Sequence, residues 1–343
     1  MTRTKRGLTS LFIALGIFSS SAVAANAESI TGGGSSFMGT FQAACSAAYK
    51  DHTVAYVASS SGTGRNQFAV GNFDFGGSEA AYGKTEFSGR QGGFNFAPIT
   101  AGPIAVAYNL KGVTALKLDD PTLGAIFSGK INKWNDDAIK KLNPNAKLPD
   151  SSIVVVYRSS NSGTTDNFSG YLVNRKVAPW KRNGVFTNAN GSGAPAGSLG
   201  FATNQQVTTA IKGTANAIGY ADLADLKSQG VKSFASLKNP AGEYVLPTTA
   251  AASKFISKQS NVQPSGLVGL DWSASIKGAY NLVAIAYLIG PNGQTDSKSI
   301  ATEEYAKYLL NSCGPKQAGK LGYLPLSGKI LDLAKTQVEK FSN

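Results

Sequence analysis

Three turns in the chain combine glycines with hydroxyl side chains at points where helices are expected to begin. They are ITGGGSSF (30–37), SSSGTGR (59–65) and RSSNSGT (158–164). Glycine lets the backbone approach a ligand closely, hydroxyl groups donate hydrogen bonds, and the first turn of a helix offers free N–H groups. One such turn is a weak signal because serines and glycines commonly cap helices. Three of them, together with the fixed cation Arg158, favour a site for an anion.

A fourth segment, NFDFGGSEAAY (72–82), lies near the second turn and contains a carboxylate, Glu79, just after a short predicted strand. Glu79 either balances a surface lysine such as Lys84 or faces the anion site. A carboxylate is unfavourable beside a fully deprotonated anion, but it accepts a hydrogen bond from an anion that carries a proton. The second interpretation therefore predicts an anion that is still protonated near neutral pH.

Other kinds of chemistry lack the residues that they need. The chain has one histidine, His52, and two distant cysteines. The usual zinc sites and the Ser/His or Cys/His nucleophile pairs therefore cannot be assembled, and no GK[ST] loop indicates a nucleotide. His52 lies in the polar stretch KDHTV and is predicted to be a surface loop residue. We expect no metal and no cofactor, and a hydrolytic enzyme is the weaker class.

The elements that must position these turns follow an alternating pattern. Apolar runs such as TVAYVA, PIAVAY, SIVVVY and NLVAIAYLI alternate with helical patterns, which is typical of α/β proteins. The third turn lies between SIVVVY and a helix that enters the core through Phe168, Tyr171 and Leu172. A helix after the first turn is indicated by Phe37, Phe41, Ala44, Cys45 and Ala48, and the last helix is predicted from Ser327 to about Phe341.

The first 27 residues have the order of a secretory signal, with basic residues, a short apolar run and small residues up to Ala27. The apolar run is too short for a membrane-spanning helix. We predict cleavage near Ala27 and a periplasmic or secreted protein. Glu28 follows the cut, so no lipid anchor is indicated. The formal charge is +13, but the lysines are scattered, so nucleic-acid binding is not predicted. In an oxidising compartment Cys45 and Cys313 form either a disulfide or two buried thiols.

Several longer motifs connect these segments to a known family. ITGGGSSF, FDFGGSE, AIGYADLA and GYLPLSGKILDLA occur with the stretch TLGAIFSGKINKWNDDAIKKLNPNAKLPDSSIVVVYRSSNSGTT. The combination of W-x-D-x-A-I-x-x-L-N-P with R-x-x-x-S-G-T is highly specific. Over nearly its whole mature length the chain resembles the extracytoplasmic phosphate-binding proteins of the phosphate ABC importer.

The resemblance implies a fold and a function. The fold would be the two-lobed α/β periplasmic-binding-protein fold (type II-like), with a ligand cleft between the lobes and two crossover strands near 104–108 and 283–287. Residues 28–105 and 284–343 would form lobe I and residues 106–283 lobe II, with hinge closure on the ligand. Both cysteines would then lie in lobe I, which favours the disulfide.

The implied function is high-affinity binding of inorganic phosphate by a monomer, without catalysis, and delivery to the membrane permease of the importer. The alternatives are a secreted phosphatase-like hydrolase on the same fold and a binder of another tetrahedral oxyanion. Carried over by motif, the phosphate ligands would be Ser36, Phe37 (through its backbone N–H), Ser61, Glu79, Arg158, Ser162, Gly163 and Thr164. Ser60 replaces Ser61 if the alignment shifts by one residue. Glu79 departs from the family, which has aspartate there.

Overall fold

The computed structural model describes residues 27–80 and 93–343. The predicted signal peptide up to residue 26 and Lys84 lie outside the described residues. Within the described ranges, no helix is long and apolar enough to cross a membrane.

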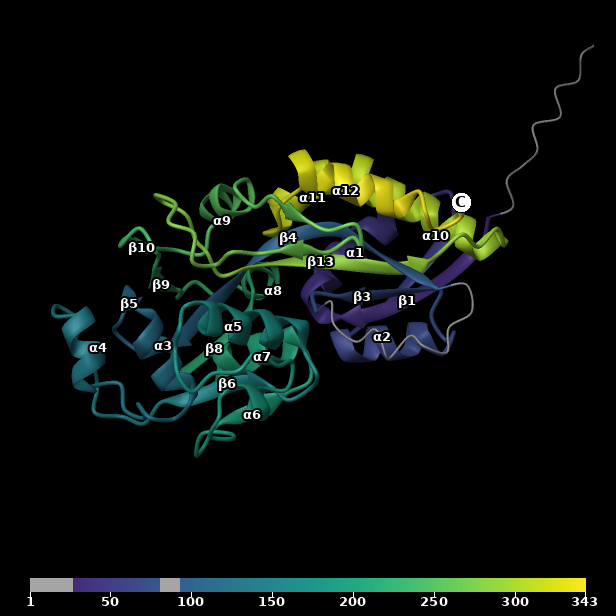
Figure 1. Cartoon of the computed structure of the whole chain (residues 1–343). Coiled ribbons are helices and arrows are strands. Elements are labelled where there is room, and N and C mark those ends of the chain that lie inside the picture. The colour runs from purple at the N-terminus through teal and green to yellow at the C-terminus, as the bar shows by residue number, and fades with distance from the viewer. Residues whose placement is uncertain (1–26, 81–92) are drawn as a thin grey trace, which may run out of the picture.

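An eight-stranded mixed sheet runs through the molecule in the order β2-β1-β3-β13-β4-β8-β6-β7 (Figure 1). Its strands are β1 (Ser29–Ser35), β2 (Thr53–Ser59), β3 (Phe75–Ser78), β4 (Phe94–Asn109), β6 (Val154–Arg158), β7 (Leu199–Phe201), β8 (Ala217–Asp222) and β13 (Val283–Pro291). Two small sheets consist of β10 (Tyr244–Val245), β9 (Ala235–Lys238) and β5 (Leu116–Leu118), and of β11 (Asn261–Val262) and β12 (Val268–Gly269).

Strand β4 connects the two halves of the large sheet. Its first part, up to Pro103, pairs antiparallel with β13, and its second part, from Ile104, pairs antiparallel with β8. We call the half that contains β1–β3 and β13 lobe I, and the half that contains β6–β8 lobe II. β4 is buried along most of its length because both of its faces are covered, so it shows a continuous apolar run instead of an alternating one.

The helices are α1 (Gly39–Ala48), α2 (Ser61–Ala69), α3 (Asp120–Phe127), α4 (Asp137–Leu142), α5 (Gly163–Asn174), α6 (Phe186–Ala189), α7 (Asn204–Gly213), α8 (Leu223–Ser228), α9 (Thr249–Ile256), α10 (Ser297–Tyr308), α11 (Gly314–Leu321) and α12 (Gly328–Val338). In lobe I, α10–α12 cover one side of the sheet and α2 lies on the other (Figure 1). The last helix follows the prediction closely and buries Ile330, Ala334 and Val338. These helices and the sheet confirm the α/β prediction.

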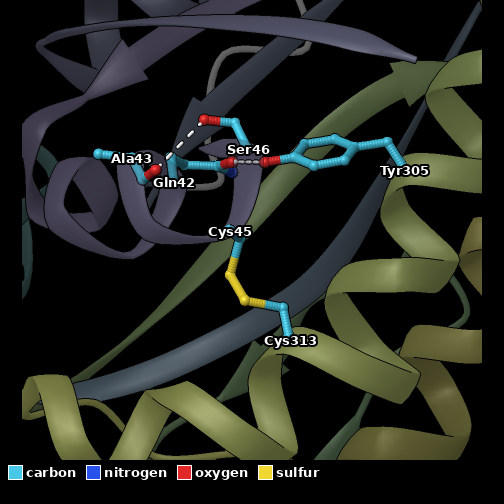
Figure 2. Close-up of a disulfide and its surroundings, with 6 residues drawn as sticks. All are labelled: Gln42, Ala43, Cys45, Ser46, Tyr305 and Cys313. Atoms are coloured by element: carbon cyan, nitrogen blue, oxygen red, sulfur yellow. Dashed lines mark hydrogen bonds between the residues drawn. A yellow bond between two sulfur atoms is a disulfide. The ribbon is translucent and has the colours of Figure 1, made fainter. Parts of the chain in front are cut away.

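A disulfide joins Cys45 in α1 to Cys313, the last residue of a π-helical turn between α10 and α11 (Figure 2). Both cysteines are buried, and their Cα atoms are 5.7 Å apart. The bond therefore connects the helix that follows the first glycine-rich turn to the C-terminal helices. The prediction of a disulfide is confirmed.

The prediction of a surface position for His52 was wrong. Its side chain is buried, because the loop before β2 folds against α10. The ring Nδ1 accepts a hydrogen bond from the backbone N–H of Glu28 at 3.1 Å, and Nε2 lies 2.6 Å from a carboxylate oxygen of Glu304. A polar local sequence did not reveal these two partners, which are 24 and 252 positions away.

Candidate anion-binding site

The three glycine-rich segments all reach the carboxyl ends of strands. The first was expected to be a turn, but its glycines lie inside β1, and only Ser36 and Phe37 follow that strand, in a 3₁₀ turn. The second segment follows β2, which is parallel to β1, and the third follows β6 in lobe II. Ligands of α/β sheets bind at such carboxyl ends. The second and third turns touch directly, since the N–H of Gly62 donates to the carbonyl of Asn161 at 3.0 Å. The site therefore forms where the two lobes meet.

Ser61 is a centre of contacts between these two turns. Its hydroxyl oxygen accepts the N–H of Gly163 at 3.2 Å and donates to a carboxylate oxygen of Glu79 at 3.3 Å. Ser60 has a different task, because its hydroxyl caps α2 by accepting the N–H of Thr63 at 3.1 Å. The geometry thus favours Ser61 over Ser60 as the side chain that faces the site.

Glu79 is buried at the end of β3, with 3% of its surface exposed. One carboxylate oxygen, Oε2, contacts Ser61, and the other, Oε1, is buried without a hydrogen-bond partner in the described part of the chain. Burial raises the pKa of Glu79 to about 7, although the neighbouring Ser35 hydroxyl and the Arg158 guanidinium act in the opposite direction. An unpartnered buried acceptor is costly, which points to a missing donor at this position.

Arg158 ends β6 and is also buried, with 1% of its surface exposed. Its guanidinium donates to the carbonyls of Ala202 at 2.9 Å and Ser59 at 3.2 Å, to the Asn204 Oδ1 at 2.6 Å and to the Ser160 hydroxyl at 3.0 Å. All four acceptors are neutral. Burial lowers the pKa of Arg158 to about 10, so the group is still a cation at neutral pH. The bond to Ser59 connects the cation of lobe II to lobe I.

The start of α5 contributes Ser162, Gly163 and Thr164. Ser162 caps the helix through the N–H of Thr165 at 3.2 Å. A Cβ atom at Gly163 would lie 2.4 Å from the Ser61 hydroxyl oxygen and 2.6 Å from a Glu79 carboxylate oxygen, so only glycine fits there. The twelve-residue helix thus directs its N-terminus at the site, where an anion is stabilised by the free N–H groups.

Ser36 and Phe37 lie in the turn after β1 and contact the rest of the site less directly. The Ser36 hydroxyl accepts the N–H of Asn204 at 3.0 Å. The N–H of Phe37 donates to the hydroxyl of Ser35 at 3.0 Å, while its ring packs edge-on against Tyr323. The structure therefore brings Ser61, Glu79 and Gly163 into mutual contact. Asn204 connects Ser36 of the first segment to Arg158 and Thr164.

Two buried polar residues of this region were not predicted. Asn204 begins α7, and Asp222 ends β8; the amide of Asn204 donates to the Asp222 carboxylate at 2.9 Å. The capping box formed by Thr203 and Gln206 identifies the start of α7 in the sequence, but nothing in the local pattern places that start beside Arg158.

The comparisons with known proteins agree with this architecture. Residues 19–312 match the family model described as "PBP superfamily domain". The phosphate-binding protein PstS of Xylella fastidiosa strain Temecula1 is 33% identical over 311 residues, covering 88% of this chain and 82% of that protein. The phosphate-binding protein PstS 3 of Mycobacterium tuberculosis strain H37Rv is 31% identical over 313 residues, with 88% and 81% covered.

Solved structures show the same fold. A high-affinity periplasmic phosphate-binding protein, PfluDING, solved with bound phosphate at pH 8.5, superposes with a TM-score of 0.77 at 20% identity, over 90% of this chain and 93% of that one. The phosphate-binding protein of Stenotrophomonas maltophilia superposes with a TM-score of 0.69 at 17% identity over the same shares. The predicted two-lobed periplasmic-binding-protein fold is confirmed, and the chain belongs to the PstS family of phosphate-binding proteins within the PBP superfamily.

Proposed function

We propose that the mature protein binds inorganic phosphate outside the cytoplasmic membrane and delivers it to the permease of a phosphate ABC importer. The observation that carries this proposal is that two buried side chains of opposite kind, a cation and an acid, occur at the same site. Arg158 is a cation whose described acceptors are all neutral, and Glu79 has a buried carboxylate oxygen that finds no partner among the described residues. A cation, Arg158, together with a hydrogen-bond acceptor, Glu79, fits an anion that carries a proton.

The proposed ligand set is the one that the family motif implies. Arg158 would bind phosphate oxygens with its planar guanidinium, and Glu79 would accept a hydrogen bond from the phosphate O–H. The remaining donors would be hydroxyl and backbone N–H groups of the three turns: Ser36, Phe37, Ser61, Ser162, Gly163 and Thr164. Phe37 would contribute its N–H after giving up its bond to Ser35, and Ser61 is preferred to Ser60 because Ser60 caps α2.

We also propose that the protein is a carrier and does no catalysis. Its one histidine, His52, is hydrogen-bonded to the backbone N–H of Glu28 and to the carboxylate of Glu304, and neither residue belongs to the proposed ligand set. Among the described residues, no group of three or more His, Cys, Asp or Glu side chains could hold a metal ion. A periplasmic or secreted monomer, cleaved near Ala27, with lobe boundaries near residues 105 and 284, completes the proposal.

Titration calorimetry on refolded, phosphate-stripped protein tests the function. We expect saturable binding of phosphate and little or none of sulfate. Heat with sulfate or with an organic phosphate, but none with phosphate, would reject the proposal in favour of a different oxyanion. An assay with p-nitrophenyl phosphate on the same sample separates the carrier from a hydrolase: sustained turnover that is lost in Arg158→Ala would favour the enzyme.

A further inference from the structure

Asn204 connects four parts of the site and is itself fully buried. Its backbone N–H donates to the Ser36 hydroxyl at 3.0 Å, and its side-chain oxygen accepts from Arg158 at 2.6 Å. Its side-chain nitrogen donates to the Thr164 hydroxyl at 3.2 Å and to the Asp222 carboxylate at 2.9 Å. Three predicted ligands therefore contact this one residue: Ser36 through its backbone N–H, and Arg158 and Thr164 through its side-chain amide.

The amide also separates Arg158 from a buried carboxyl group. The nearest carboxylate along this hydrogen-bond chain is that of Asp222, which contacts the Asn204 nitrogen and not the guanidinium. Asp222 is held from its other side by the N–H of Asp225 at 2.9 Å and by the Tyr323 hydroxyl at 3.4 Å. Burial and the neighbouring Asp225 raise the pKa of Asp222 well above its usual value. The guanidinium of Arg158 is thus separated from this carboxyl group by the neutral amide of Asn204.

We propose that Asn204 is a positioning residue of the anion site, which orients Arg158 and Thr164 and keeps a carboxylate from binding the guanidinium directly. This inference rests on the proposed phosphate function. Only an amide meets both requirements at this position, because its oxygen accepts from Arg158 while its nitrogen donates to Thr164 and Asp222. A carboxylate at this position would pair with Arg158, lose both donations and lie against Asp222.

The variant Asn204→Asp tests the proposal because it changes the charge and the donors but hardly the volume. At pH 8 we expect phosphate to bind roughly 10- to 100-fold more weakly than to the parent, the range for losing one hydrogen bond to a charged group. The difference in phosphate affinity between parent and variant should become smaller as the pH falls toward 5, because the introduced carboxyl then becomes protonated and neutral. The groups that face it, present in parent and variant alike, are Arg158, Asp222, Asp225, Tyr323 and, across the site, Glu79. The ratio of the two affinities therefore reports the introduced carboxyl together with its effect on the neighbouring Asp222.

Asn143→Asp is the matched control. Asn143 is another buried asparagine of lobe II whose oxygen accepts one hydrogen bond and whose nitrogen donates two, but its partners are Lys117 and Ile139, away from the site. The Asn143→Asp substitution should lower the melting temperature of the protein and leave its affinity for phosphate unchanged.

The possible outcomes separate the two proposals. If the parent binds no phosphate, the proposed function fails. If the parent binds phosphate and Asn204→Asp binds equally well at pH 8, or binds more weakly by a factor that stays constant with pH, the positioning role is wrong. Should Asn204→Asp not fold, Asn204→Ser supplies the test: it is uncharged and too short to reach all three partners, so it should weaken phosphate binding at every pH, and parent-like binding would contradict the proposal.

Discussion

The two ionisable side chains of the proposed ligand set are held in opposite ways. Arg158, in lobe II, donates to four neutral acceptors. Glu79, in lobe I, has one oxygen bound to Ser61, and its other oxygen has no partner within the described ranges. Both are buried to almost the same extent. The cation is therefore fixed before an anion arrives, and the acid retains an acceptor for it. We infer that Arg158 chiefly provides affinity and that Glu79 chiefly provides selectivity.

The largest effect is expected when the acceptor is changed. Phosphate near neutral pH keeps a proton, so its O–H group can donate a hydrogen bond to Glu79, whereas sulfate has no such donor. Sites built on such a hydrogen bond reject the analogue without it by about 10⁴-fold or more. In Glu79→Gln the amide can also donate to sulfate, so the phosphate-to-sulfate affinity ratio should fall by a large part of that factor, as measured by competitive titration.

Glu303→Gln is the control for that experiment, since Glu303 is equally buried but binds Lys307 and Ser342. Its anion selectivity should match the parent. If Glu79→Gln has the same anion selectivity as the parent, Glu79 does not distinguish phosphate from sulfate by the phosphate O–H group.

The pKa of Glu79 predicts a pH dependence of stability in the ligand-free protein. Because burial raises this pKa from 4.5 to about 7, the folded state holds the proton more tightly than the unfolded state. Protonation of Glu79 therefore contributes about 3 kcal/mol to the free energy of unfolding. This contribution is fully present below pH 4.5 and is lost as the pH rises to about 7. Chemical denaturation of parent and Glu79→Gln at pH 5 and pH 8 measures it: the parent should lose more stability between these pH values than the variant. An equal loss in both proteins would contradict the buried, unpartnered state of the acid.

The third effect concerns the shape of the cation. Arg158→Lys keeps the charge but cannot reach four acceptors and an anion in one plane, so the affinity for phosphate should fall by about 1–3 kcal/mol. Arg175→Lys is the control, because Arg175 bonds to Asp120 and lies outside the proposed ligand set. If Arg158→Lys binds phosphate as tightly as the parent, charge alone is sufficient and the arrangement of neutral acceptors is not needed for affinity.

Much of the fold could be predicted from the sequence because it rests on local patterns. The apolar runs predicted β2, β4, β6 and β13, and the second and third glycine-rich segments follow β2 and β6 as expected. The glycines of the first segment were expected in a turn but lie inside β1. Asn204 could not be predicted, because its importance comes from being close to Arg158, 46 positions earlier in the chain. His52 was misplaced for the same reason: polar neighbours in the sequence suggested exposure, while Glu304 and Glu28 cover it in the fold.

The disulfide makes most of the chain a covalent ring. It joins residues that are 268 positions apart, and both β4 and β13, the central strands of the sheet, lie inside that ring. A protease that cuts the backbone once between Cys45 and Cys313 therefore cannot release either fragment, and the nicked molecule keeps its two pieces tethered. Such a molecule would run as one band on a non-reducing gel and as two bands after reduction. In an oxidising compartment such as the periplasm, where this disulfide persists, one cut in the backbone therefore leaves both fragments of the protein joined.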